Sequence, residues 1–302
     1  IDNTFYTVGE INVFIEEIET LMQELNDKMA DEAMDNKPAE SLKFKKESMY
    51  IVDLYKIFFS KENTHLKERV FSHSPLSKEE TQKIWEKYFR FTPMKLALPL
   101  IKYRLNQKKV LDIGSAFGEF LIHFGAGSKG IEVLPESVRF EKAIGLNVDE
   151  YNFEDEWRED SESYDAVWCS NVLEHVVAPH LLLRRFHDAL KTNGLVFIRV
   201  PTIPSNWSYL KLNKLFLGFL GYEAIQHINA FTRKTAEFTI ERAGFKIIES
   251  NIFLPENRMF NKIFNIFLKD ALSFITVVGQ KIPFEYHQKR PEVHNPKWLG
   301  SN

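Results

Sequence analysis

The 302-residue sequence lacks the features of several protein classes. It contains a single cysteine, Cys169, so no internal disulfide can form and a cysteine-rich zinc site is excluded. It has no Gly-X-Y period, no low-complexity tract and no apolar run of about 18 residues. Collagen, extensive disorder and a membrane-spanning helix are therefore not expected. The opening residues lack a basic stretch followed by an apolar one, so we expect no signal peptide and a cytoplasmic location.

Neither sign of charge dominates, because the formal net charge is −3. The distribution is uneven: residues 1–40 carry 11 acidic and 2 basic side chains, whereas residues 41–106 carry 14 basic and 7 acidic ones. A basic segment can indicate a nucleic-acid partner. Here the basic residues are interleaved with acids and follow no DNA- or RNA-binding signature. We therefore expect helical segments of opposite charge that pack on each other or on a partner, and no nucleic acid.

The first third of the chain is predicted to be helical. Apolar residues alternate in steps of four and three along residues 7–35, which is a short heptad seam. It covers fewer than three heptads, so a helical hairpin or a dimer contact is favoured over a free coiled coil. A second helical pattern runs from about 41 to 71, and Ser77 with Glu80 forms the pattern of a capping box. Residues 1–105 are assigned to an N-terminal helical region.

The pattern changes at about residue 108, where short β-rich runs alternate with helical stretches. This alternation predicts an α/β fold with a mostly parallel, seven-stranded sheet of the Rossmann-like kind, closed by an antiparallel pair. Strands are expected at 109–114, 130–134, 147–151, 164–170, 194–201, 246–253 and 273–281. Helices are expected at 118–124, 135–144, 178–190 and 235–243, the third with Leu181, Leu182, Phe186 and Leu190 facing inward.

The strongest chemical signal is the sequence VLDIGSAFGEFL at residues 110–121. A strand ends in Asp112 and enters a turn of small residues, where the backbone can approach a ligand closely. Glu132, 18 residues after Gly114, ends the next strand and is suited to bind ribose hydroxyls. A dinucleotide-binding turn requires G-x-G-x-x-G, and its first and third glycines fall on Asp112 and Phe117. An acid at the first position would repel a pyrophosphate but suits a cationic ligand, so a nicotinamide-dependent reductase is disfavoured.

Residues 108–282 resemble the class I S-adenosylmethionine-dependent methyltransferases, in particular the branch with ubiquinone-biosynthesis and sugar O-methyltransferases. The resemblance covers somewhat more than half of the chain, with five motifs in order. They are VLDIGSAFGEF, GIEVLPESV, SYDAVWCSNVLEHV, LKTNGLVFIRVP and HINAFTRKTAEFTIERAGFKII. The first motif usually reads D-x-G-x-G-x-G, and Ala116 stands at its middle glycine. A methyl group there is acceptable if the local φ is negative.

The resemblance implies that S-adenosylmethionine is the cofactor and S-adenosylhomocysteine the product. Asp112 would support the glycine loop, Glu132 would bind the ribose hydroxyls, and Arg90 would pair with the cofactor carboxylate, although a plain surface role is an equal alternative for Arg90. The remaining residues assigned to the cofactor line its other portions. They are Gly114, Ser115, Ala116, Phe117 and Gly118 in the loop, Val133 after the second strand, Asn152 and Phe153 beside the adenine, with Glu154 as the alternative to Asn152, and Ser170 and Asn171 beside the methionine moiety.

Methyl transfer from a sulfonium needs an aligned acceptor, and a hydroxyl acceptor must also lose its proton. His175 and His227 are the candidate general bases, because histidine titrates near neutrality. The alternative for His175 is a helix-start residue bonded to backbone. Glu174 and His175 are neighbours of the type that binds metals, but two ligands do not define a site, and no metal is assigned. Cys169 lies in a buried strand pattern and is expected to be a core residue.

The methyltransferase core is assigned to residues 106–302, with a cap insert at about 202–230 and a late insert at about 255–272. Both inserts are unusually apolar and are expected to pack in the core or at a subunit contact, with a hydrophobic acceptor or a peripheral membrane contact as alternatives. The predicted function is methylation, most simply of an oxygen on a small-molecule, sugar or lipid-linked acceptor. The alternative is an inactive methyltransferase-like binding or scaffold subunit. A homodimer through the N-terminal helices is a further open point.

Overall fold

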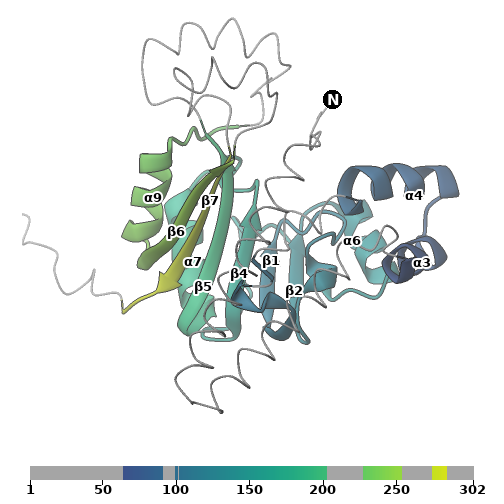
Figure 1. The fold of residues 1–302 in the computed structure, drawn as a ribbon, viewed down its shortest axis with the longest axis horizontal. Helices are drawn as coiled ribbons and strands as arrows, with labels where there is room; N and C mark the ends of the chain where they lie inside the picture. Colours follow the sequence, from purple (N-terminus) through teal and green to yellow (C-terminus); the bar gives the residue numbers. More distant parts are fainter. Residues whose placement is uncertain (1–63, 91–98, 101, 203–226, 254–273, 284–302) are drawn as a thin grey trace, which may run out of the picture.

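A computed structural model describes residues 64–90, 99–100, 102–202, 227–253 and 274–283 (Figure 1). The described part forms one seven-stranded sheet in the order β3-β2-β1-β4-β5-β7-β6. The first five strands in this order pair in parallel, and β7 pairs antiparallel with both β5 and β6. The strands are β1 Val110–Ile113, β2 Lys129–Glu132, β3 Val148–Glu150, β4 Tyr164–Ser170, β5 Leu190–Pro201, β6 Phe245–Phe253 and β7 Phe274–Lys281. The predicted fold class, seven strands and closing antiparallel pair are confirmed.

The central strands are apolar because both faces of the sheet are covered. Leu111 and Ile113 of β1 join one buried cluster, whereas Val110 joins another that contains Trp168 of β4 and Phe197 of β5. Successive side chains of a strand point to opposite faces, so the two clusters lie on opposite sides of the sheet. Cys169 is buried in the first cluster, as expected, and burial raises the pKa of its thiol well above the usual value.

Three helices cover the sheet: α6 Pro135–Ala143, α7 Pro179–Ala189 and α9 Arg233–Arg242. A proline in the first turn favours the start of α6 and of α7, because its missing N–H would have no partner there. In α7, Leu182 and Phe186 face inward as predicted, but Leu181 is 51% exposed, so its predicted inward orientation is wrong. Leu183 is buried instead, because the inward-facing stripe of α7 runs through residues 182, 183, 186 and 189. Leu190 is buried as predicted, but as the first residue of β5 and not in the helix.

The upstream helices pack beside α6 at the β2–β3 end of the sheet (Figure 1). They are α3 Thr64–His73, α4 Lys78–Ile84 and the π-helical turn η1 Trp85–Phe89. Phe89 packs against Phe140 of α6, and Arg69 Nε donates to the carbonyl oxygen of Ile144 at 2.7 Å. The predicted capping box is present at the start of α4. The heptad seam at 7–35, most of the predicted helix at 41–71 and most of both inserts lie outside the described residues, so the division into regions stays a prediction.

The predicted helix at 118–124 is absent. The chain forms turns there, followed by a single 3₁₀ turn, η3 Leu121–His123. Gly118 has φ of +79°, and its N–H donates to the carbonyl oxygen of Ser115 and closes a tight turn. Only six residues separate Gly118 from Gly125, too few for a stable helix before the chain returns to β2. The glycine loop is consequently not followed by an α-helix.

Within the ranges that the structure describes, none of the helices combines the length and the apolar character needed to cross a bilayer.

Candidate functional site

The candidate site lies where the strand order reverses, between β1 and β4. From β1 the chain moves to β2 and β3 on one side, then returns to β4 and β5 on the other. In parallel α/β sheets the loops after the strand carboxyl ends diverge at such a point and leave room for a ligand. The glycine loop after β1, Glu132 at the end of β2 and the segment from Ser170 after β4 all lie at this edge.

The glycine loop, residues 114–118, folds back over β2. The N–H groups of Gly114 and Ser115 both donate to the carbonyl oxygen of Ile131, at 2.9 and 3.2 Å. Gly114 has φ of +69°, and a Cβ there would lie 2.7 Å from Val172, so glycine is required on both counts. Ala116 has φ of +52°, so the condition under which its methyl group was acceptable is not met. A left-handed alanine costs roughly 1–2 kcal/mol, and the loop stores that strain at the family's middle glycine.

Glu132 anchors the loop with its carboxylate. Its Oε2 accepts from the N–H of Ala116 at 2.9 Å, and its Oε1 accepts from the N–H groups of Val133 and Leu134 at 2.7 and 3.0 Å. The residue is buried, 6% exposed. A carboxylate offers about four acceptor positions, so three backbone donors leave about one for a ribose hydroxyl. Binding both hydroxyls therefore requires that Glu132 exchange one backbone donor for the ligand.

A buried group of acids lies under the loop. Burial raises the pKa of Asp112 well above its ordinary value, and the charges of Glu119, Glu141 and Glu132 raise it further. Asp112 Oδ2 is buried without a hydrogen-bond partner among the described residues, and the hydroxyl of Ser115 interacts with the buried carboxyl of Glu141, whose pKa it lowers. A ligand with positive charge would relieve this repulsion. The sulfonium and ammonium groups of S-adenosylmethionine meet that requirement, so the residues present fit the cofactor that the sequence implies.

Glu141 provides a test of this acidic group. Burial and the neighbouring Glu132 and Glu119 raise its pKa from 4.5 to about 8. Between these values the folded protein binds more protons than the unfolded chain, so its free energy of unfolding falls as pH rises from about 4.5 to about 8. We expect Glu141→Gln to remove much of that loss and to stabilise the protein at pH 8 by on the order of 3 kcal/mol, with little effect near pH 4.5.

Urea unfolding at both pH values would measure this effect. The exposed Glu136 of the same helix supplies the matched control, because Glu136→Gln is expected to change stability by less than about 0.5 kcal/mol at either pH. An equal effect of Glu141→Gln at both pH values would show that packing, not buried charge, is the cause.

The residues assigned to the adenine lie next to this loop edge. Phe153 is buried in the main core, whereas Val133 is 45% exposed and available to a ring. Asn152 is exposed and engaged within its own turn, since its Nδ2 donates to Asp155 and its Oδ1 accepts from the N–H of Glu154. The side chain of Asn152 thus caps a turn, and its place beside the adenine stays a prediction.

The residues assigned to the methionine side differ in exposure. Ser170 ends β4 with its Oγ buried and without a partner among the described residues, and Asn171 follows in the left-handed region with φ of +57°. Arg90 follows η1, is half exposed and forms an ion pair with Glu86 at 2.5 Å. Tyr88 reaches the glycine loop instead, with its ring 4.8 Å from that of Phe117.

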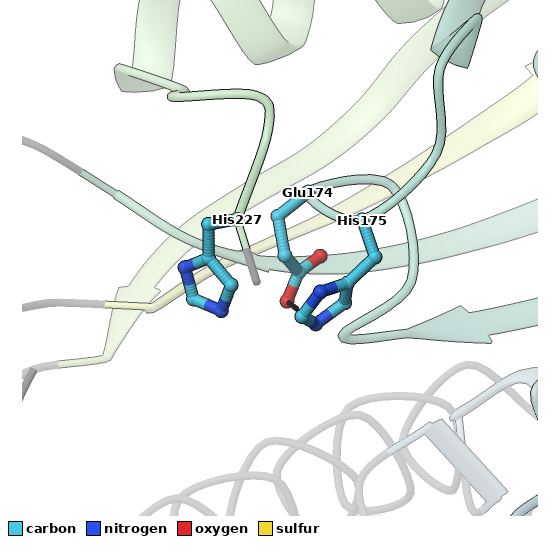
Figure 2. A group of neighbouring side chains, drawn as sticks. All are labelled: Glu174, His175 and His227. Atoms are coloured by element: carbon cyan, nitrogen blue, oxygen red, sulfur yellow. Dashed lines mark ion pairs between the residues drawn. The ribbon is translucent and has the colours of Figure 1, made fainter. Parts of the chain in front are cut away.

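The two candidate bases lie together. The imidazoles of His175 and His227 meet edge to face with ring centroids 4.7 Å apart, and Nε2 of His175 lies 3.9 Å from Oε1 of Glu174 (Figure 2). These residues come from segments more than 50 positions apart, the loop after β4 and the segment before α9. Glu174 is buried, which raises the pKa of its carboxyl to about 7. One nitrogen from each imidazole and one carboxylate oxygen lie within 4.8 Å of one another, a donor set that also suits a transition metal.

Two residues tie the loop after β4 in place, a role that the sequence predicted for neither. Oε1 of Glu154 accepts from the N–H of Val177 at 2.6 Å, and Nδ2 of Asn229 donates to the carbonyl oxygens of Leu173 and Val176 at 3.2 and 2.5 Å. Both contacts join segments that are distant in the sequence, so no local pattern reports them. Asn229 lies inside the last of the five motifs, and Glu154 was expected only as an alternative to Asn152 beside the adenine.

Comparisons with known proteins agree with this geometry. A family model described as "Methyltransferase domain" matches residues 84–250, more than half of the chain. One curated relative is the ubiquinone biosynthesis O-methyltransferase of Glaesserella parasuis serovar 5 (strain SH0165), 31% identical over 134 residues, with 38% of this chain and 57% of the relative covered. Another, of the same name, is from Xanthomonas euvesicatoria pv. vesicatoria (strain 85-10), 28% identical over 153 residues, with 45% and 64% covered. The chain thus spans somewhat over half the length of these relatives.

Solved structures show the same kind of likeness at lower identity. A methyltransferase from Archaeoglobus fulgidus, described as S-adenosylmethionine-dependent, is 18% identical with a TM-score of 0.45, covering 72% of this chain and 99% of that one. A chain of the complex between the Haloferax volcanii Trm112 methyltransferase activator and a methyltransferase is 17% identical with a TM-score of 0.49, covering 68% and 95%. The family match, which carries the conclusion, covers the glycine loop, Glu132, strands β1 to β5 and most of β6. The chain therefore belongs to the class I S-adenosylmethionine-dependent methyltransferases.

Proposed function

We propose that the protein transfers a methyl group from S-adenosylmethionine to an oxygen atom of a small-molecule acceptor. The observation that carries the proposal is the imidazole pair, His175 and His227, at the strand edge that also carries the glycine loop. An oxygen acceptor needs a proton acceptor beside it, whereas a thiolate or an unprotonated amine does not. The names of the curated relatives, which are O-methyltransferases, support the same choice of atom.

The cofactor would be held by the groups at the ends of β1, β2 and β4. Glu132 would bind the ribose, Val133 and Phe153 would flank the adenine, and the backbone of residues 114–118 would line the amino-acid portion. The buried acids beneath the loop favour a ligand with two positive groups. Arg90 remains a proposed partner of the carboxylate of S-adenosylmethionine. It can form that pair only if it releases its ion pair with Glu86. When bound, S-adenosylmethionine supplies an electrophilic methyl group on a sulfonium.

The imidazole pair would act on the acceptor, whose hydroxyl proton must be removed. The acceptor oxygen would take the methyl group that the cofactor supplies, and the electron pair of the carbon–sulfur bond would stay with the departing S-adenosylhomocysteine. The hydroxyl proton passes to one imidazole of the pair. The buried carboxyl of Glu174 lies beside this pair, with its Oε1 3.9 Å from Nε2 of His175. Alignment of the acceptor and exclusion of water supply most of the acceleration.

The test is direct detection of the product. Cell extract incubated with the protein and methyl-labelled S-adenosylmethionine should contain a new species, heavier by one labelled methyl group, in untargeted mass spectrometry. Fragmentation that locates the label on oxygen supports the proposal, and the same product identifies the class of acceptor among small molecules, sugars and lipid-linked intermediates. Label on nitrogen or carbon would overturn the choice of acceptor atom. Binding of the cofactor without any labelled product would favour the inactive binding subunit.

A further inference from the structure

Asn229 lies two residues beyond His227 and is the contact between the two loops that carry the imidazoles. Its Nδ2 donates to the carbonyl oxygens of Leu173 and Val176, which flank Glu174 and His175. Both partners are carbonyl oxygens, so the orientation of the carboxamide is determined: the amino group must face the loop. Both of its N–H bonds are thereby used on one loop.

The backbone repeats this connection. The N–H groups of Ile228 and Asn229 both donate to the carbonyl oxygen of Glu174, at 2.9 and 3.0 Å. Four hydrogen bonds thus join this short segment to the turn that contains His175. The segment continues into the buried Phe231 and the isolated bridge between Thr202 and Phe231, so its far end is fixed to the end of β5. The near end is held by Asn229.

We propose that Asn229 is a positioning residue that holds His227 against His175. This inference rests on the proposed function for its catalytic consequence, but the geometry it concerns is independent of any acceptor. His227 lies two residues before Asn229, and its ring faces the Glu174–His175 pair in Figure 2. The two side-chain bonds of Asn229, together with the backbone bonds of Ile228 and Asn229, fix the backbone beside His227 to the turn that carries His175.

The sharpest variant is Asn229→Asp, which keeps the shape and replaces the donating amino group by an oxygen. That oxygen would face two carbonyl oxygens and repel them. We expect the wild-type protein to show a nuclear Overhauser effect between the rings of His175 and His227. This effect should be lost in Asn229→Asp. The backbone amides at positions 228 and 229 should exchange with solvent at least about tenfold faster, because the remaining bonds open more often. A second variant, Asn229→Ala, removes the side-chain donors without adding charge, and its ring contact and exchange rates should change in the same direction.

The catalytic readout separates positioning from folding. For the acceptor identified by mass spectrometry, Asn229→Asp should lower kcat at least about tenfold while the affinity for S-adenosylmethionine stays within about twofold. Asn147 supplies the matched control, because its Nδ2 also donates to a carbonyl oxygen, that of Ser128, but before β3 and away from the imidazoles. Asn147→Asp should leave the ring contact, the exchange rates and kcat unchanged.

The outcomes are distinguishable. Fast exchange of the Ile228 amide in the wild-type protein, or an unchanged ring contact in Asn229→Asp, would overturn the inference whatever the enzyme does. If the protein transfers no methyl group at all, the proposed function fails, and the exchange and ring-contact measurements still decide the role of Asn229. Loss of the ring contact with unchanged kcat would show that the position of His227 does not matter for turnover. That result would also overturn the inference that Asn229 is a positioning residue.

Discussion

Replacement of Glu132 by alanine is expected to lower the affinity for S-adenosylmethionine by more than about 100-fold. The carboxylate is proposed to bind the ribose hydroxyls, and two charge-assisted hydrogen bonds contribute together about 3 kcal/mol, which corresponds to about two orders of magnitude in Kd. It also holds the N–H of Ala116, so its loss loosens the strained loop as well. Isothermal titration calorimetry with the cofactor would measure the change.

Two controls make this result specific. Glu136→Ala removes an acid from the exposed first turn of α6 and should leave the affinity within about twofold. Glu132→Gln keeps the length of the side chain but turns one acceptor into a donor, so it should also bind weakly while the protein still unfolds cooperatively. If either Glu132 variant binds the cofactor as well as the wild type, the ribose is held elsewhere.

Replacement of both His175 and His227 by glutamine is expected to lower kcat by between about 10²- and 10⁴-fold, the usual contribution of a general base. The affinity for the cofactor should stay within about twofold, because neither histidine is among the proposed cofactor ligands. The measurement is the steady-state rate with the acceptor identified by mass spectrometry. His180→Gln, on the exposed side of α7, is the control and should retain full activity.

The single variants and a chelator separate acid–base catalysis from metal binding. Under acid–base catalysis, one of the two histidines accepts the hydroxyl proton of the acceptor. Replacement of that histidine alone by glutamine should then account for most of the fall in kcat. Dialysis against EDTA should then leave kcat unchanged. Loss of activity on dialysis and its return with added Zn²⁺ or Mg²⁺ would show instead that the three donor atoms hold a metal and that the histidines act as ligands.

The fold could be predicted from the sequence where local pattern and tertiary environment agree. The run at 164–170 is apolar because β4 is covered on both faces, so its bounds were predicted without error. The predicted helix at 118–124 failed because the chain there must reverse within a few residues, and two glycines override the apolar spacing. The exposure of Leu181 could not be predicted, because a periodic pattern leaves the edge of the inward-facing stripe of a helix uncertain by a residue.

The site could be predicted in part for the same reason. Asp112, Gly114 and Glu132 were found because the loop that they form is local and has a fixed spacing. The left-handed conformation of Ala116 was not expected, since nothing in the sequence reports φ at an alanine. From the sequence, Glu141 is predicted to be a surface charge on a polar helix. It is buried only because α6 packs under the loop. Asn229 acts through two carbonyl oxygens more than 50 residues away, which no local pattern can contain.

The position of β7 has a consequence for how the chain acquires its structure during synthesis. β7 lies between β5 and β6 although it comes last along the sequence. Until residues 274–281 have been made, β5 and β6 therefore each have an edge that β7 will later occupy. An exposed edge of this kind is a template for pairing with another chain. A nascent or truncated chain that stops short of Phe274 should accordingly aggregate, even though the glycine loop and both histidines are already present.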